Sequence, residues 1–150
     1  MRGLIALLVI LAPIAAAQAT EDDQRTVAAM AGKARVLIAF APTLADARMN
    51  QQRTEMARFA IGAAQRDLVF VQVDQTHVIG AKDLAADLRA HFQVPPSAYR
   101  TLLIGKEGGI DLTANGPIPA DRLAQVIDAT PSRQEEVRRA HAGRPVESHY

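Results

Sequence analysis

The residues that could carry chemistry are few, and one type is missing altogether. The 150-residue chain contains no cysteine, so it can form neither a disulfide nor the thiolate on which thiol-based redox catalysis depends. No histidine lies three or four residues from another, and none belongs to an H-E-x-x-H pattern. The four histidines are His77, His91, His141 and His149. The sequence therefore predicts no metal site and no cofactor.

The glycine-rich segment 105–109 and the serines also lack the context of a catalytic motif. A Walker-type phosphate loop needs G-x-x-x-x-G-K-[ST] leading into a helix, whereas here Glu107 follows Lys106 and a short strand is expected next. The segment is instead predicted to be a hairpin turn in which glycines supply positive φ angles. None of the three serines lies in G-x-S-x-G, so no hydrolase nucleophile is evident.

The N-terminus has the form of a secretory signal peptide. Arg2 precedes an apolar run over residues 4–12, which Pro13 ends. Two small-residue cleavage sites follow, at residues 15–17 and 17–19. A membrane anchor is the alternative, but a spanning helix needs about 20 apolar residues and this run is shorter. We expect a signal peptide over residues 1–17, export to the periplasm or the extracellular space, and no transmembrane segment in the mature chain.

The charge balance bears on the class of partner. Removing residues 1–17 removes one charge, that of Arg2, and leaves 16 basic and 16 acidic groups. A neutral mature chain argues against nucleic acid as the main partner and against electrostatic steering of an acidic substrate. Hydrophobic residues make up 49% of the chain, which is enough material for one core without disulfides.

The apolar segments alternate between the patterns of buried strands and amphipathic helices. Continuous runs rich in branched residues favour strands buried on both faces, and stripes with a spacing of three and four residues favour helices. Strands are expected over residues 36–40, 68–73, 99–104 and 110–113, helices over 46–64, 81–92 and 119–129, and a loop over 74–80. The order β-α-β-α-β-β-α predicts an α/β fold, a mixed sheet with helices on both faces, parallel crossovers and a final antiparallel hairpin.

Two of these helices carry specific expectations about their faces. The stripe in the first expected helix consists of Met56, Phe59, Ala60 and Ala63. The inward face of helix 81–92 is expected to consist of Ala81, Leu84, Ala85, Leu88 and Phe92. Asp83 and Asp87, on another face of that helix, are interpreted as solvated and distant from any cleft.

The chain divides into four parts. After the signal peptide comes an N-terminal arm over residues 18–33, in which residues 26–31 favour a short helix ended by Gly32. The main domain is expected over residues 34–130. Residues 131–150 are expected to form a helix of one or two turns and a loose tail, with Glu135 and Arg139 at a favourable i, i+4 spacing.

Three segments carry a resemblance to a known family. Residues 35–42, 99–112 and 127–131 have the sequences RVLIAFAP, YRTLLIGKEGGIDL and IDATP. Together they resemble the domain-of-unknown-function family 4174, which consists largely of small exported bacterial proteins and is related to the P-DUDES domains of animal extracellular-matrix proteins. The resemblance covers about residues 30–140. It implies a thioredoxin-like fold with no established reaction.

A more distant resemblance connects the same segments to peroxiredoxins. Residues 40–42, Phe-Ala-Pro, resemble the strand end before the P-x-x-x-T-x-x-C loop of those enzymes, with Asp46 at the threonine position and Met49 at the cysteine position. Residues 99–101, Tyr-Arg-Thr, resemble their Tyr-Arg-Gly, whose arginine helps to hold the thiolate and the peroxide. The resemblance implies that Arg100 is retained without a thiolate, which puts peroxidase and disulfide-exchange activity out of reach.

The same resemblance suggests a candidate ligand site at one end of the sheet. If the fold is thioredoxin-like, Arg100 and Asp46 lie where such proteins bind substrates, and an arginine there could hold a carboxylate or a phosphate in bidentate fashion. The structural alternatives are an internal ion pair, or an N-cap role for Asp46 beside a solvated Arg100. Pro42 and Met49 complete the candidate site, and no residue is assigned a catalytic role.

Three functional hypotheses follow, in order of preference. The first is a non-enzymatic module that binds a protein or a peptide around residues 42–49 and 97–100. The second is an enzyme or an anion-binding protein that uses Arg100 and Asp46. The third is a cysteine-free scaffold that partners a redox enzyme. The sequence identifies neither the partner nor the oligomeric state.

Overall fold

The computed structural model describes residues 25–143. The expected signal peptide, the arm up to residue 24 and the tail from residue 144 lie outside the described residues. Within residues 25–143, no helix is long and apolar enough to cross a membrane.

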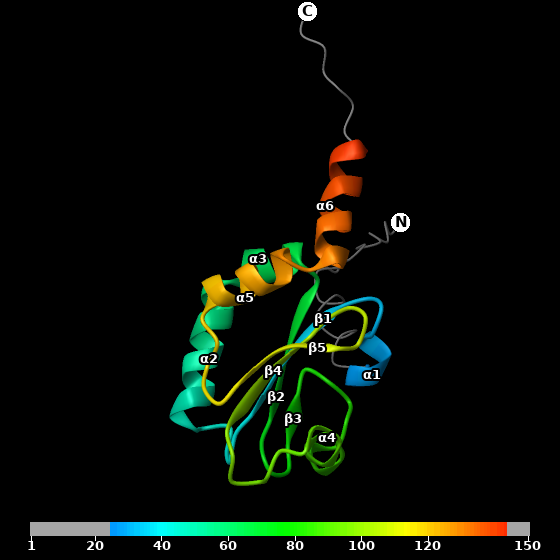
Figure 1. The fold of residues 1–150 in the computed structure, drawn as a ribbon. Helices are drawn as coiled ribbons and strands as arrows, with labels where there is room; N and C mark the ends of the chain where they lie inside the picture. The colour runs from blue at the N-terminus through cyan, green and yellow to red at the C-terminus, as the bar shows by residue number, and fades with distance from the viewer. Residues whose placement is uncertain (1–24, 144–150) are drawn as a thin grey trace, which may run out of the picture.

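A mixed five-stranded sheet forms the centre of the domain (Figure 1). Its strands lie in the order β3-β2-β1-β4-β5, and only the β1–β2 pair is parallel. The strands are β1 (Arg35–Phe40), β2 (Leu68–Val73), β3 (Val78–Ile79), β4 (Arg100–Ile104) and β5 (Ile110–Ala114). Every residue of the central strand β1 is buried, as expected for a continuous apolar run covered on both faces. The predicted mixed sheet is therefore confirmed.

The direction of β4 differs from the expectation. A parallel crossover from β2 was predicted, but β4 runs antiparallel to β1. The reason is β3, a two-residue strand within the segment expected to be a loop, which pairs antiparallel with β2 and reverses the chain. The crossover through the next helix thus joins β3 to β4, which run in the same direction. A strand of two residues is too short for any periodicity to reveal.

Helices cover both faces of the sheet (Figure 1). One face carries α1 (Val27–Met30) and α4 (Ala85–Phe92), and the other carries α2 (Ala47–Arg58), α3 (Ala60–Gln65) and α5 (Ala120–Asp128). Because side chains alternate along a strand, Ile38 and Phe40 of β1 pack under α4, while Leu37 packs on the opposite side with α5. The predicted placement of helices on both faces is confirmed.

The helix expected over residues 46–64 is broken at Phe59, which caps both α2 and α3. The Phe59 ring packs on the core and lies so close to Gly62 that a Cβ there would come within 2.2 Å of it. Met56 and Ala63 also face the core as predicted. Ala60 is exposed, because the break changes the helical register after Phe59.

The helix expected over residues 81–92 begins only at Ala85. Leu84 is its N-cap in an extended conformation and is 68% exposed, so its predicted inward orientation is wrong. Ala85 and Leu88 are buried, and Ala81 and Phe92 pack against the same core as predicted.

A helix lies near each end of the described chain. Thr26 caps α1, whose Val27 and Met30 are buried in the core. At the other end, α6 (Pro131–Ala142) extends away from the sheet, and its Glu135 accepts a hydrogen bond from Arg139 at 3.0 Å (Figure 1). The predicted i, i+4 pair is confirmed, and the helix is longer than the one or two turns expected.

Candidate functional site

Asp46 caps the N-terminus of α2 and pairs with a neighbour rather than with Arg100. Its carboxylate accepts hydrogen bonds from the backbone N–H of Arg48 at 2.9 Å and from the Arg48 guanidinium at 3.0 and 2.8 Å. The side-chain hydrogen bond from Arg48 is the main reason that the pKa of Asp46 lies below its usual value. The structure therefore gives Asp46 the N-cap role weighed above.

Met49 is fully buried one turn into α2. It packs with Ala39, Ala41 and Tyr99, and Phe70 covers the same cluster. Burial raises the pKa of the Tyr99 hydroxyl, which accepts from Thr101 at 3.3 Å and donates to the backbone carbonyl of Arg48 at 3.4 Å. Apolar and hydrogen-bonded groups thus close the Met49 position to solvent.

Arg89 holds the loops at this end of the sheet, and no sequence pattern singled it out. Its buried guanidinium donates to the backbone carbonyls of Ala41 at 2.6 Å, Pro95 at 2.7 Å and Asp74 at 3.1 Å. These carbonyls follow β1, precede β4 and follow β2, respectively, so one side chain joins three loops. Pro42, half-buried, follows the first of them. The sequence did contain one signal for this role, since Arg89 lies within a mostly apolar helical face.

Arg100 lies on the opposite face of the sheet from Met49. It pairs with Phe40 across the antiparallel β1–β4 ladder, and residues directly opposite one another in such a ladder share a face. Phe40 belongs to the core beneath α4. Among the candidate residues, the structure therefore keeps Asp46 and Met49 together at the start of α2 and separates Arg100 from them.

The Arg100 side chain has no polar partner within the part of the chain that the structure describes. Its Nε atom is buried and makes no hydrogen bond. The side chain lines a hollow of about 350 Å³ together with His91, Gln93 and Thr113. Arg100 is thus a half-buried cation with hydrogen-bonding capacity left over, beside an open space.

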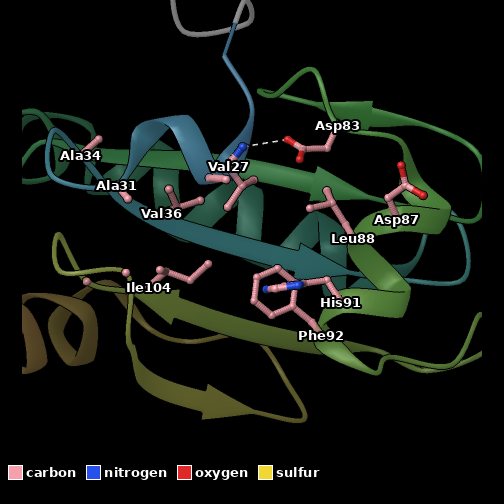
Figure 2. Close-up of a pocket in the computed structure, with 13 residues that line it drawn as sticks. Val27, Ala31, Ala34, Val36, Asp83, Asp87, Leu88, His91, Phe92 and Ile104 are labelled. Atoms are coloured by element: carbon pink, nitrogen blue, oxygen red, sulfur yellow. Dashed lines mark hydrogen bonds between the residues drawn. The ribbon is translucent and has the colours of Figure 1, made fainter.

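A larger hollow of about 520 Å³ lies between α1, α4 and β4 (Figure 2). Its walls are mostly apolar, with Val27, Val36, Leu88, Phe92 and Ile104 among them. Figure 2 shows the residues of α1 and α4 facing one another across this space.

Asp83 and Asp87 lie at the edge of this larger hollow, so their interpretation as a face distant from any cleft was wrong. The Asp83 carboxylate accepts from the backbone N–H of Val27 at 2.8 Å, which joins α1 to the start of α4. Because α1 comes from a distant part of the sequence, the pattern within α4 could not reveal the cleft.

The two hollows adjoin, because His91, Phe92 and Gly108 line both. We call the combined feature the α4 groove. The carboxylates of Asp83 and Asp87 line the larger hollow, the guanidinium of Arg100 lines the smaller one, and His91 and Phe92 lie where the two meet. No group of three potential metal-ligating side chains occurs within residues 25–143. Such an arrangement suits recognition of a ligand that is partly apolar and carries charge.

The fold defines a thioredoxin-like domain, and Met49, which the resemblance to peroxiredoxins places at their cysteine position, is buried in it. The family comparison is more specific. The profile of the family described as domain of unknown function DUF4174 matches residues 26–136, and the chain belongs to this family. No curated protein matches the chain significantly.

Solved structures with a similar fold have little sequence in common with this chain. The reduced 2-Cys peroxiredoxin of Plasmodium vivax aligns with a TM-score of 0.57 and 14% identity, over 73% of this chain and 84% of that one. A thioredoxin-fold protein of Helicobacter pylori aligns at 0.47 and 11%, over 82% and 87%. StoA of Bacillus subtilis aligns at 0.45 and 16%, over 62% and 81%. At such identities the peroxiredoxin likeness supports the fold alone.

Proposed function

We propose that this chain is an exported binding module without thiol chemistry, which holds a segment of another protein in the α4 groove. The observation that carries the proposal is the apolar hollow of about 520 Å³ with two carboxylates at its edge. The occupant is a peptide segment with a large apolar side chain next to a basic one.

The apolar part of the groove supplies the affinity. Burying a leucine-sized side chain contributes about 1.5–3 kcal/mol, and the hollow has room for more than one such group. Val36 and Ile104 form its floor on adjacent strands, so the site stands on rigid elements. This rigidity lowers the entropic cost of binding.

The carboxylates supply a charge preference. Asp83 is held in place by the N–H of Val27, while Asp87 is exposed on α4. A lysine or arginine next to the inserted apolar group lies near both, whereas an acidic group there is repelled. The occupant therefore carries positive charge at this end.

The opposite face of the sheet supports binding rather than catalysis. Met49 has no reactive group, the Tyr99 hydroxyl donates to the backbone carbonyl of Arg48 in α2, and the Asp46 carboxylate caps α2 through the N–H of Arg48. The proposal of export is supported by the signal-like residues 1–17, and N-terminal sequencing of the secreted fraction tests it by the appearance of a chain that starts at residue 18 or residue 20.

The binding proposal is tested with a random heptapeptide phage library selected on the purified protein, followed by affinity measurements on synthetic copies of the enriched peptides. Ala28 lines the hollow on its exposed side, so Ala28→Trp fills it. Ala57 is exposed on α2 on the far side of the sheet, and Ala57→Trp is the matched control. We expect binding to weaken at least tenfold in the first variant and to stay unchanged in the second. Equal binding to both variants, or no enrichment on the wild type, contradicts the proposal.

A further inference from the structure

We propose that the α4 groove selects its peptide by charge order, with an acidic side chain at Arg100 and a basic side chain about three residues away at Asp83 and Asp87. This inference rests on the proposed function and adds the ligand class to it.

Arg100 has the properties of an unpaired anion receptor. Its Nε atom is already out of contact with water and has no acceptor in the described structure. Folding has therefore already removed water from part of this cation, so less desolvation remains to be made up when a ligand binds. A carboxylate that enters the smaller hollow forms charge-assisted hydrogen bonds with the guanidinium, which are about twice as strong as neutral ones.

Thr113 and Gln93 give the same hollow neutral polar groups around the guanidinium. Among residues 25–143, no acidic side chain lines this hollow, so none of the described wall residues competes with an incoming carboxylate for Arg100. The carboxylates of the groove are confined to the other hollow, whose edge holds Asp83 and Asp87. The groove is therefore polarised from end to end.

The length of α4 sets the spacing of the two charges on the ligand. Asp87 lies in the first turn of the helix, and Gln93, which lines the Arg100 hollow, is its C-cap. Six residues of α-helix span about 9 Å, at 1.5 Å per residue. A peptide in the polyproline II conformation has three residues per turn and advances about 3.1 Å per residue, so side chains three positions apart lie on the same face and are separated by about 9 Å. A basic and an acidic residue flanking two apolar residues match this distance.

The test uses two amide-capped peptides that contain Lys-Leu-Leu-Glu or the reversed Glu-Leu-Leu-Lys, because the structure leaves both chain directions open. Each has a counterpart with glutamine in place of the glutamate. Affinities are measured by fluorescence anisotropy. We expect one direction to bind, and its glutamine counterpart to bind about tenfold more weakly. Binding of the glutamate-containing peptide should weaken as the salt concentration is raised.

Variants of the protein test whether Arg100 causes the preference for glutamate over glutamine. Arg100→Gln should remove the preference for glutamate over glutamine, and Arg100→Lys should restore part of it. Arg122→Gln is the matched control, because Arg122 is exposed on α5 and, within residues 25–143, bonds only to Gln125. It makes the same change of charge away from the groove and should leave the preference intact. Circular dichroism of each variant shows whether the fold is retained.

The outcomes separate this inference from the proposed function. If the peptides bind and Ala28→Trp weakens them, but glutamate and glutamine bind equally, the groove binds peptides and the charge order is refuted. If Arg122→Gln removes the preference as fully as Arg100→Gln, the effect is one of net charge and Arg100 is not the receptor. If none of the four peptides binds while library peptides do, the charge order is refuted. If no peptide of either kind binds, the proposed function fails as well.

Discussion

Replacing Glu136 with glutamine should destabilise the domain at neutral pH and matter much less in acid. The Glu136 carboxylate lies at the point where α6 meets the sheet. It contacts the Nζ of Lys106 at 2.7 Å, the guanidinium of Arg35 at 3.2 and 3.3 Å, and that of Arg133 at 3.3 Å. Arg35 is fully buried at the start of β1, so glutamine would leave a buried cation without its counter-charge.

The size of the effect follows from the pKa of this carboxyl group. Burial by itself would raise the pKa of Glu136, but hydrogen bonds from Lys106, Arg35 and Arg133 outweigh it and lower the pKa from 4.5 to about 2. Each pKa unit corresponds to about 1.4 kcal/mol, which gives an upper limit of about 3 kcal/mol. The side chain is 24% exposed, and solvent screening reduces the expected loss to about 2 kcal/mol.

The pH dependence has a definite sign. Because the pKa of Glu136 is lower in the folded state than in the unfolded state, its stabilisation is fully present above about pH 4.5 and is lost as the pH falls towards 2. With these two pKa values, more than half of it is lost by about pH 3. The free energy of unfolding of the wild type should therefore approach that of Glu136→Gln as the pH falls.

Urea denaturation followed by circular dichroism, at pH 7 and at pH 3, measures the loss of stability and its dependence on pH. Glu135→Gln is the matched control, because Glu135 lies on the same helix and, among the residues that the structure describes, pairs only with the exposed Arg138 and Arg139. It should unfold at the same urea concentration as the wild type at pH 7. A difference between Glu136→Gln and the wild type that is equally large at both pH values, or a control that is equally destabilised, would refute the assignment of the effect to this carboxylate.

Two further variants test the other end of the sheet. Arg89→Met deprives the carbonyls of Ala41, Asp74 and Pro95 of their shared donor and should lower the free energy of unfolding by about 3–5 kcal/mol in urea denaturation. A loss below about 1 kcal/mol would show that water replaces the guanidinium. Met49→Cys creates the only thiol of the chain at a fully buried position, so a disulfide reagent such as dithiobis(nitrobenzoate) should label it only after unfolding; rapid labelling of the folded variant would show that this position is open.

The sequence predicted the elements well where periodicity extends over several turns or residues. The strands β1, β2, β4 and β5 and the helix α5 lie close to their expected ranges, because continuous apolar runs and helical stripes are strong signals. The prediction was weaker where tertiary contacts decide where an element begins or ends. Phe59 interrupts a continuous helical pattern because its ring packs over Gly62, and the two residues of β3 redirect the chain without a pattern of their own.

The candidate site was predicted less well, since it depends on which face of the sheet each side chain occupies. Proximity at one end of the sheet follows from the order of the elements, and both Asp46 and Arg100 do lie at that end. Whether they meet depends on strand register, and the pairing of Arg100 with Phe40 directs it towards α4. The α4 groove needs α1, α4 and the β4–β5 turn together, three segments that are far apart in the sequence.

This separation of faces changes how the absence of cysteine should be interpreted. By resemblance alone, Arg100 is what remains of a thiol site whose cysteine position holds Met49. In the folded domain the two side chains lie on opposite sides of the sheet: Met49 is buried beside Tyr99, and Arg100, which has no polar partner among residues 25–143, lies beside an open hollow. An arginine kept only to serve a thiolate would be expected to face the thiolate position. Arg100 faces the α4 groove instead, so the recognition proposed for it depends on the walls of that groove and not on the residue at position 49.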